Sequence, residues 1–119
     1  MTEETCILSI IICAYNERRT IRQAIDEARR VDLGAGWEKE VIVVDNCSTD
    51  GTRELLTAVD LPDVRIVLHE RNRGKSASIL TGVREARGDY FAVFDADLEY
   101  EADDLARMTA AVNPKDTVA

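Results

Sequence analysis

The chain is organised around Phe91-Ala92-Val93-Phe94-Asp95-Ala96-Asp97-Leu98-Glu99, an apolar run that ends in two aspartates. A short run of aromatic and β-branched residues predicts a buried strand. Side chains two positions apart in a strand point to the same side, so Asp95 and Asp97 can face one point just past the strand end. Two convergent carboxylates suit Mg²⁺ or Mn²⁺. A polar turn closing the strand is the competing interpretation, because Asp-x-Asp triplets are common by chance.

The composition bounds the class of protein. The 119 residues suffice for one domain with a hydrophobic core, and we assign 1–119 to a single domain. Hydrophobic residues make up 45% and charged residues 32%, which is typical of globular proteins. The formal net charge of −8 argues against nucleic acid as the main partner. Residues 89–119 carry eight acidic and two basic side chains, an excess that suits a bound cation.

The cysteines and the single histidine match no metal or catalytic motif. Cys6, Cys13 and Cys47 are odd in number and lack metal-binding spacing, which predicts free thiols in a reducing compartment. His69 ends an apolar run with no triad near it, so we interpret it as a strand-end residue rather than a catalytic one. No apolar run reaches membrane-spanning length, and a basic signal segment is absent. We expect a cytoplasmic protein, a location compatible with attachment of a longer form to the cytoplasmic face of a membrane.

Apolar runs and helical periodicities alternate along the chain. Strands are predicted at 6–13, 41–44, 64–68 and 90–94. Helices should follow each strand, with apolar stripes at 21–28, 55–59, 79–86 and 105–112. Thr20-Ile-Arg-Gln23 predicts a capping box at the start of the first helix. The alternation implies parallel pairing with right-handed crossovers, so we expect an α/β fold with a Rossmann-like, mostly parallel sheet of about four strands and flanking helices.

All four strand-to-helix turns would then meet at one edge of the sheet, where ligands of such folds bind. The turns are 14–19, 45–52, 69–76 and 95–101. Each of them carries polar or charged residues, and this coincidence favours a ligand site over a simple polar turn. The side chain of Asp45 could accept hydrogen bonds from a base. A divalent cation at the aspartate pair would bridge a diphosphate and act as a Lewis acid on the leaving group.

Arg71, Arg73 and Lys75 form a cationic stretch that could neutralise such a diphosphate. Solvated turn residues are the competing interpretation for the two arginines. Gly74-Lys75-Ser76 does not make a P-loop, because the first glycine of that motif is replaced by His69.

Two further ligand-binding classes are also disfavoured. A calcium loop starting at Asp95 would need glycine where Tyr100 stands and glutamate where Ala106 stands. A dinucleotide-binding domain would need Gly-x-Gly-x-x-Gly after the first strand, and that motif is absent.

Four motifs occur in a familiar order. They are Ser9-Ile-Ile-Ile-Cys-Ala-Tyr-Asn-Glu17, Val43-Val-Asp-Asn-Cys-Ser-Thr-Asp-Gly-Thr52, Asn72-Arg-Gly-Lys75 and Phe94-Asp-Ala-Asp-Leu-Glu-Tyr100. Together they resemble the family 2 glycosyltransferases, inverting enzymes with a GT-A fold, and most of all the branch of polyprenyl- and dolichyl-phosphate sugar transferases. The resemblance covers almost the whole chain and corresponds to the N-terminal, nucleotide-binding half of a GT-A domain.

The resemblance implies roles for residues that match the family motifs. Ala14, Tyr15 and Glu17 would line the base and ribose of the nucleotide, and Asp45 would bind the base. Lys75, with Arg71 or Arg73 nearby, would lie near the nucleotide or its phosphates. Two departures fall within these motifs. The proline that often precedes Tyr-Asn-Glu in the family is absent, because Cys13-Ala14 stands there, and the common Asp-Asp-Gly-Ser is here Asp45-Asn-Cys-Ser48.

The same resemblance implies a metal site. Asp95 and Asp97 would be the Asp-x-Asp pair, the first nearer the ribose and the second on the metal, and Glu99 would complete the site. The second half of such domains supplies the acceptor site and the carboxylate base. We identify no catalytic base in this chain, expect it beyond the C-terminus, and therefore expect the chain alone to be inactive.

We expect a metal-dependent, inverting glycosyltransferase that takes its sugar from a UDP- or GDP-sugar. The acceptor would be a polyprenyl phosphate or a glycan. The alternative is a truncated, non-catalytic α/β module that binds a nucleotide or associates with itself through an uncovered sheet edge, forming a homo-oligomer. A sugar-1-phosphate nucleotidyltransferase is less favoured, because no glycine-rich loop follows the first strand.

Overall fold

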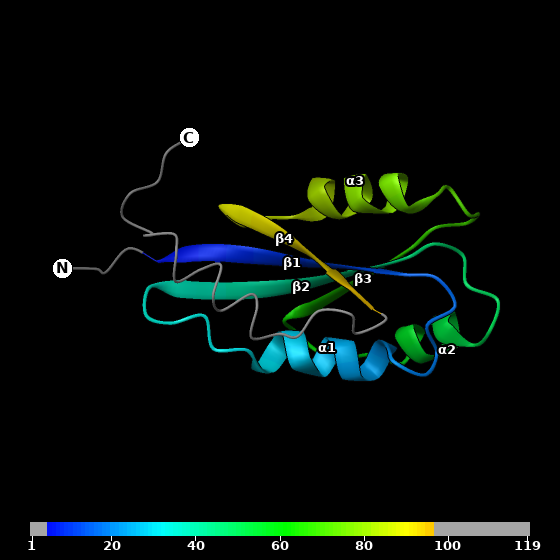
Figure 1. Ribbon diagram of the computed structural model, residues 1–119, viewed down its shortest axis with the longest axis horizontal. Coiled ribbons are helices and arrows are strands. Elements are labelled where there is room, and N and C mark those ends of the chain that lie inside the picture. The colour runs from blue at the N-terminus through cyan, green and yellow to red at the C-terminus, as the bar shows by residue number, and fades with distance from the viewer. Residues whose placement is uncertain (1–4, 97–119) are drawn as a thin grey trace.

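The computed structural model describes residues 5–96, in which strands and helices alternate (Figure 1). The strands are β1 (Cys6–Ala14), β2 (Trp37–Asp45), β3 (Val64–Leu68) and β4 (Tyr90–Asp95). The helices are α1 (Ile21–Arg30), α2 (Thr52–Thr57) and α3 (Lys75–Glu85). The predicted alternation is confirmed for this part of the chain, and the helix expected after residue 100 lies outside the described residues.

The four strands form one parallel sheet in the order β3-β2-β1-β4. Helix α3 lies on one face of the sheet, and α1 and α2 lie on the other (Figure 1). The centre of β1 is completely buried at Ile10, Ile11 and Ile12. A continuous apolar strand of this kind is typical of a parallel sheet that is covered on both faces. The predicted α/β fold is therefore confirmed.

Helix α1 provides most of the core on its side of the sheet. Its apolar residues recur at helical spacing and are all buried, namely Ile21, Ala24, Ile25 and Ala28. They pack against alternate residues of the strands together with one leucine of α2. These partners are Leu8, Ile10, Ile12, Ala14, Val41, Val43, Leu56, Ala92 and Phe94. Alternate side chains of each strand point to one face of the sheet, and there they pack against the apolar stripe of the helix, as the geometries of strand and helix require.

Helix α3 approaches the opposite face closely because Gly82 lies against Ile11. A Cβ atom built on Gly82 would stand 2.4 Å from Ile11 Cγ2. Glycine inside a helix costs about 1 kcal/mol relative to alanine. The absence of a side chain at this contact explains why glycine is found there.

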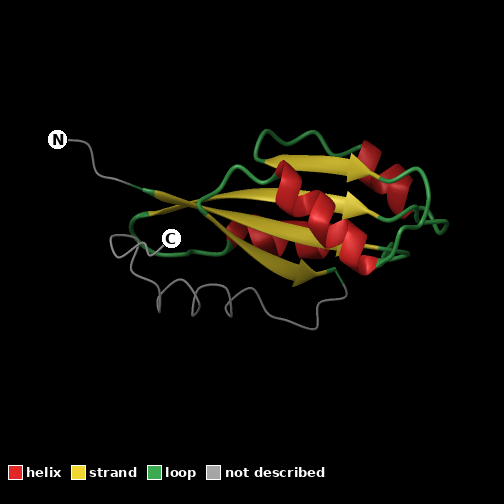
Figure 2. Cartoon of the chain, turned by 90° about the horizontal axis from the view of Figure 1, so that it is seen from above, coloured by secondary structure: helices red, strands yellow, loops and turns green. Residues whose placement is uncertain are grey.

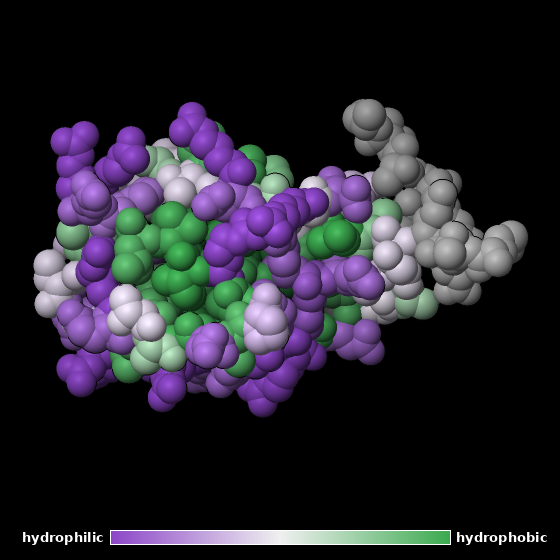
Figure 3. Space-filling view, turned by 180° about the vertical axis from the view of Figure 1, so that it is seen from behind, coloured by the Kyte–Doolittle hydropathy of each residue, from purple (hydrophilic) through white to green (hydrophobic). Residues whose placement is uncertain are grey.

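Both edge strands of the described sheet leave apolar surface exposed. Phe91 and Val93 of β4 are 52% and 37% exposed, and Leu80 of α3 is 49% exposed. Figure 2 shows α3 over the middle strands, with β4 uncovered on that side. At the other edge, β3 is partly exposed along its whole length, and apolar surface is visible there from behind (Figure 3). Within residues 5–96, no helix has both the length and the apolar character needed to span a membrane.

Two local predictions were wrong. Strand β2 begins at Trp37, four residues before the predicted start, because it pairs with the whole of β1 from Cys6 onward. The capping box does not form, since the Thr20 side chain makes no cap bond. Thr20 Oγ1 instead donates to Glu17 Oε2 at 3.4 Å, within the turn before α1.

Glu40 fastens the α3–β4 turn to the sheet. Its Oε2 atom accepts hydrogen bonds from Ser9 Oγ and from Arg87 N, both at 2.6 Å. Gly88 N donates to Ser9 Oγ at 2.9 Å and completes the contact. Burial raises the pKa of Glu40, but the hydrogen bonds from Ser9 and Arg87, with the charges of Arg65 and Arg87, outweigh it and leave the pKa below its usual value.

We predict that Glu40→Gln destabilises the fold in a pH-dependent way. A depressed folded-state pKa means that the carboxylate contributes stability above its unfolded pKa near 4.5 and loses it as the pH falls through the folded pKa. The free energy of unfolding should drop by about 1–2 kcal/mol at neutral pH, and the difference from wild type should shrink in acid. Urea unfolding at several pH values measures this, with Glu38→Gln, an exposed position on β2, as the control. An equal loss at acid and neutral pH would contradict the prediction.

We also predict that Gly82→Ala is destabilising although it improves helix propensity. The propensity gain is about 1 kcal/mol, whereas forcing a methyl group into a filled core costs about 1–3 kcal/mol. The Cβ would meet three side-chain atoms of Ile11 within 3.2 Å, so we expect the steric cost to win. Thermal and urea unfolding measure the sign. In an Ile11→Ala background the same change should become neutral or stabilising, and stabilisation of the wild-type chain by Gly82→Ala would contradict the prediction.

Candidate functional site

The carboxyl ends of the strands lie at one end of the sheet (Figure 2). The strand register places Ala14 beside Asp45, and Cys13 beside Asp95. The turns that leave β1, β2 and β3 therefore gather at the same edge as the end of β4. In open parallel sheets, this edge is where ligands bind.

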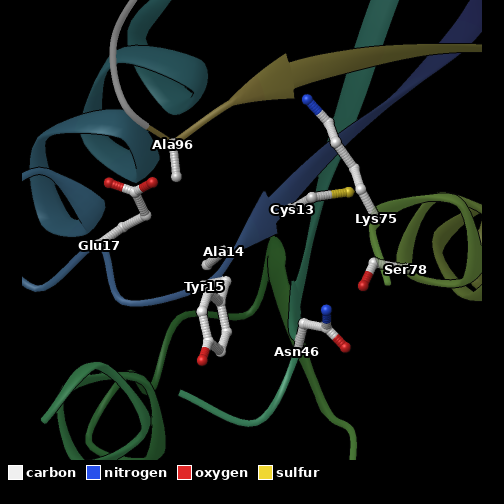
Figure 4. Close-up of a pocket in the computed structure, with 8 residues that line it drawn as sticks. All are labelled: Cys13, Ala14, Tyr15, Glu17, Asn46, Lys75, Ser78 and Ala96. Atoms are coloured by element: carbon white, nitrogen blue, oxygen red, sulfur yellow. The ribbon is translucent and has the colours of Figure 1, made fainter. Parts of the chain in front are cut away.

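A cavity of about 150 Å³ lies at this edge (Figure 4). It is lined by Cys13, Ala14, Tyr15, Glu17, Asn46, Lys75, Ser78 and Ala96. Figure 4 shows these side chains around the end of β1, with Glu17 and Lys75 on opposite sides in this view. Four of the predicted nucleotide-binding residues are therefore brought together in one cavity.

The turn after β1 is held by the turn after β2. Asn16 has a positive φ of 53°, a conformation that asparagine tolerates better than most residues. Asn16 N donates to Ser48 Oγ at 2.8 Å, and Thr49 N donates to Asn16 Oδ1 at 2.7 Å. The neighbouring Tyr15 is thereby presented at the cavity, where its side chain is 45% exposed.

Thr52, the first residue of α2, positions Glu17. Its hydroxyl is completely buried, accepts from Glu17 N at 3.1 Å and donates to Asp50 Oδ1 at 2.5 Å. Asp50 Oδ2 in turn accepts from Arg18 N at 3.3 Å. Each backbone N–H of Glu17 and Arg18 thus finds a partner in the second turn, and the Glu17 side chain is held at the cavity wall.

Asp45, the last residue of β2, is completely buried and does not line the cavity directly. Its carboxylate accepts from Ser48 N at 3.0 Å and from Ser48 Oγ at 2.5 Å. Arg53 Nη1 approaches the same carboxylate at 3.4 Å. The side chain therefore supports the turn next to the cavity.

Asn46 connects the second turn with the third. Asn46 Nδ2 donates to Asn72 Oδ1 at 3.0 Å, and Arg73 N donates to Asn46 Oδ1 at 2.8 Å. Gly74 N also donates to Asn72 Oδ1 at 3.0 Å. These bonds hold the loop that precedes α3 against a residue of the cavity wall.

The first turn of α3 borders the cavity through Lys75 and Ser78. Gly74, just before the helix, has a φ of 88°, which favours glycine. Helix N-termini attract anions through their free N–H groups and dipole, and Lys75 adds a positive charge. Arg71 and Arg73 are exposed in the preceding loop, so of the three predicted cations only Lys75 lines the cavity.

The predicted metal site lies mostly beyond the described residues. Asp95 ends β4, and its backbone is paired with Cys13, which lines the cavity. Asp97 and Glu99 fall outside residues 5–96. Within that range, histidine, cysteine and carboxylate side chains form no group of three or more that could hold a metal ion. The sheet therefore brings the start of the Asp-x-Asp stretch to the cavity.

Four lining residues were missed by the sequence prediction, namely Cys13, Asn46, Ser78 and Ala96, the last of which stands between the two aspartates of the predicted pair. Asn46 directly follows the predicted Asp45 at the strand end, which is a usable signal. Ser78 stands three positions after Lys75 and shares its helix face. Cys13 gives no signal, because a cysteine at the end of an apolar run is usually a core residue.

The sequence matches the model of glycosyl transferase family 2 over residues 9–119. It is 39% identical over 101 residues to the succinoglycan biosynthesis protein ExoO of Rhizobium meliloti (strain 1021), covering 85% of this chain and 28% of that protein. It is 30% identical over 114 residues to a dolichol-phosphate mannosyltransferase of Pyrococcus furiosus, covering 94% and 32%. An undecaprenyl-phosphate 4-deoxy-4-formamido-L-arabinose transferase of Pseudomonas aeruginosa (strain LESB58) is 32% identical over 105 residues, covering 86% and 31%.

Solved structures share the fold. The mannosyltransferase PcManGT from Pyrobaculum calidifontis, in complex with GDP-Man and Mn²⁺, superposes with a TM-score of 0.76 at 31% identity, covering 92% of this chain and 33% of that chain. TarS of S. aureus, in complex with UDP-GlcNAc, gives a TM-score of 0.66 at 25% identity, covering 87% and 30%. The fold is thus that of the N-terminal part of a GT-A glycosyltransferase.

The chain spans about a third of the length of the curated relatives it matches. The family model nevertheless covers nearly all of it, and the four motifs that suggested the resemblance lie on the expected strands and turns within the described residues, except where the last motif runs past residue 96. The chain belongs to glycosyl transferase family 2.

Proposed function

We propose that this chain is the donor-binding part of a metal-dependent, inverting glycosyltransferase that uses a nucleoside-diphosphate sugar. The observation that carries the proposal is the composition of one cavity. An exposed aromatic ring, a carboxylate and an ammonium group line it, and Ala96, between the two aspartates of the Asp-x-Asp stretch, lines it as well. Such a cavity offers separate partners for a base, a ribose and a diphosphate.

The base and ribose would lie along the turn after β1. The exposed ring of Tyr15 offers a flat surface for stacking, and Ala14 leaves room beside it. Glu17 can accept hydrogen bonds from ribose hydroxyls. Asp45 is completely buried and does not line the cavity, so we propose that it acts on base binding indirectly, through its contacts with Ser48 and Arg53.

The diphosphate would lie at the start of α3. Lys75 supplies a point charge there, and the N–H groups and dipole of the helix N-terminus add to it. The exposed Arg71 lies in the adjoining loop, where its long side chain could add a bidentate contact.

A divalent ion would be held by Asp95, Asp97 and Glu99. The donor set fits Mg²⁺ or Mn²⁺, because these ions prefer carboxylate oxygens and also bind phosphate oxygens. When bound, the ion would neutralise charge on the departing diphosphate. The complex of PcManGT with GDP-Man and Mn²⁺ supports the assignment of both donor class and metal.

The acceptor site and the catalytic base would come from the part of the relatives' length that this chain does not span. The names of two relatives specify dolichol phosphate and undecaprenyl phosphate, and ExoO belongs to glycan synthesis. We therefore propose a polyprenyl phosphate or a growing glycan as acceptor. Its hydroxyl or phosphate oxygen would attack the anomeric carbon directly, with inversion.

A second candidate is a self-associating module, favoured by the exposed apolar side chains Leu80, Phe91 and Val93. Apolar side chains next to an open strand edge are prone to pair with other chains. Self-association through this surface is compatible with nucleotide binding, and it would be a property of the 119-residue chain itself.

We predict that the chain binds GDP or UDP in the presence of Mn²⁺ and that Asp97→Ala reduces this affinity at least tenfold, because a charge-assisted metal contact is lost. Calorimetric titration with each nucleotide, with and without Mn²⁺, measures this and identifies the base. Asp60→Ala is the matched control, since it removes the same charge from an exposed residue before β3. Metal-independent binding, or equal affinity in both variants, would contradict the metal assignment, and failure of the folded chain to bind either nucleotide would contradict the donor site.

We predict concentration-dependent self-association, because removing the exposed apolar side chains at β4 from water lowers the free energy. Sedimentation velocity at increasing concentration should show a shift to larger species. Phe91→Ser should reduce that shift, whereas Thr57→Ser, an exposed position on α2, should leave it unchanged. A monomer at every concentration would rule out the second candidate.

A further inference from the structure

His69 is the only histidine of the chain and lies in a network that reaches the cavity. It follows β3 directly and is only 6% exposed. Its Nδ1 atom lies 3.3 Å from Asn46 Oδ1, and its Nε2 atom lies 2.8 Å from Thr81 Oγ1. Asn46 lines the cavity, and Thr81 belongs to α3. The imidazole therefore links a cavity residue to the helix whose first turn also lines the cavity.

Two neighbours determine which way the Asn46 amide points. Arg73 N donates to Asn46 Oδ1, and Asn46 Nδ2 donates to Asn72 Oδ1. Asn72 Oδ1 is itself committed as an acceptor, because Gly74 N donates to it. Exchanging the oxygen and nitrogen of Asn46 would oppose donor to donor and acceptor to acceptor. The atom that faces the imidazole is therefore an oxygen.

An oxygen opposite Nδ1 requires the ring proton to be on Nδ1. In the neutral ring, Nε2 is then an acceptor. The Thr81 hydroxyl has a single proton, which it can donate either to Ala77 O at 3.0 Å or to Nε2 at 2.8 Å. With the ring proton on Nδ1, that proton goes to Nε2 and the bond to Ala77 O is given up. The contacts thus select one tautomer of His69.

The charged groups around His69 favour this neutral form. Burial lowers the pKa of His69, the charge of Arg73 lowers it further, and Asp45 at the end of β2 raises it by less. From α2, Arg53 Nη1 donates to the backbone oxygen of His69 at 2.6 Å. The lowered pKa of His69 favours the uncharged ring.

We infer that His69 is a positioning residue of the cavity, which holds Asn46 by donating from Nδ1 and, through Asn46, holds the loop 70–74 in place. With His69 and Arg73 N both donating to its Oδ1, the Asn46 amide cannot rotate without losing two bonds. The loop that ends at Gly74, just before Lys75, keeps its position as a result. The effect on nucleotide affinity rests on the proposed function, whereas the tautomer and the loop contact do not.

The tautomer is measurable on the wild-type chain without any ligand. Because the chain has one histidine, a long-range ¹H–¹⁵N correlation spectrum of a ¹⁵N-labelled, tag-free sample shows a single imidazole. We expect the Nδ1–H pattern at neutral pH and a titration midpoint below 6.5, the ordinary value. An Nε2–H pattern at neutral pH would overturn the inference.

A matched pair of variants separates positioning from packing. His69→Asn places an amide nitrogen near the position of Nδ1 and so keeps a donor to Asn46. His69→Gln places its amide nitrogen near the position of Nε2 and so loses the donor to Asn46. Both variants remove the ring and should lose similar thermal stability. We expect amide hydrogen exchange at Arg73 to be about fivefold faster in His69→Gln than in His69→Asn, the factor for one ordinary hydrogen bond. Equal exchange rates in two folded variants would mean that His69 serves packing alone.

The affinity for nucleotide gives the functional readout. With Mn²⁺ present, His69→Gln should bind the preferred nucleotide about fivefold more weakly than His69→Asn, because the loop 70–74 is held less firmly in His69→Gln. If exchange at Arg73 differs while affinity does not, the link from loop to cavity is overturned and the proposed function stands. If the wild-type chain binds no nucleotide, the proposed function fails, and the tautomer and exchange results still decide whether His69 holds the loop.

Discussion

Parallel pairing of β1 with both β2 and β4 is the constraint on which the site depends. Parallel strands must be joined by crossovers, so every strand carboxyl end reaches the same edge. Cys13, at the end of β1, stands beside Val44 on one side and Asp95 on the other. Strand pairing alone, without any contact between loops, therefore brings segments from distant parts of the sequence to one cavity. The fully buried isoleucines of β1 pack this arrangement into the core.

The turns at that edge then need partners for backbone groups that have left the sheet ladder. The turn after β2 supplies them on both sides. Ser48 and Thr52 accept from the backbone of the turn after β1, and Asn46 accepts from the backbone of the turn before α3. Residues that resemble ordinary turn formers are thus the framework that holds the cavity together. The positions of the ligand-facing side chains are set by these backbone contacts more than by the chemical nature of those side chains.

Local patterns predicted the strands, the apolar stripe of α1 and the meeting of the turns, because each depends on residues close in sequence. The early part of β2 escaped prediction, since Glu38 and Glu40 interrupt its apolar run while pairing with β1 keeps it extended. The capping box failed because the Thr20 hydroxyl found Glu17 within the turn. Roles for Asp97 and Glu99 stay predictions, since they lie outside the described residues.

Sequence alone established the fold class, the family resemblance and the edge at which a ligand would bind, because periodicity and motif order are properties of the linear chain. Tertiary structure decided which groups form hydrogen bonds with one another and which are in steric contact. The carboxylate of Glu40, the missing side chain of Gly82 and the ring proton of His69 acquire their roles from partners far away in sequence. Hydrogen bonds and steric contacts act over a few ångströms in space, and only the folded sheet brings those partners within that range.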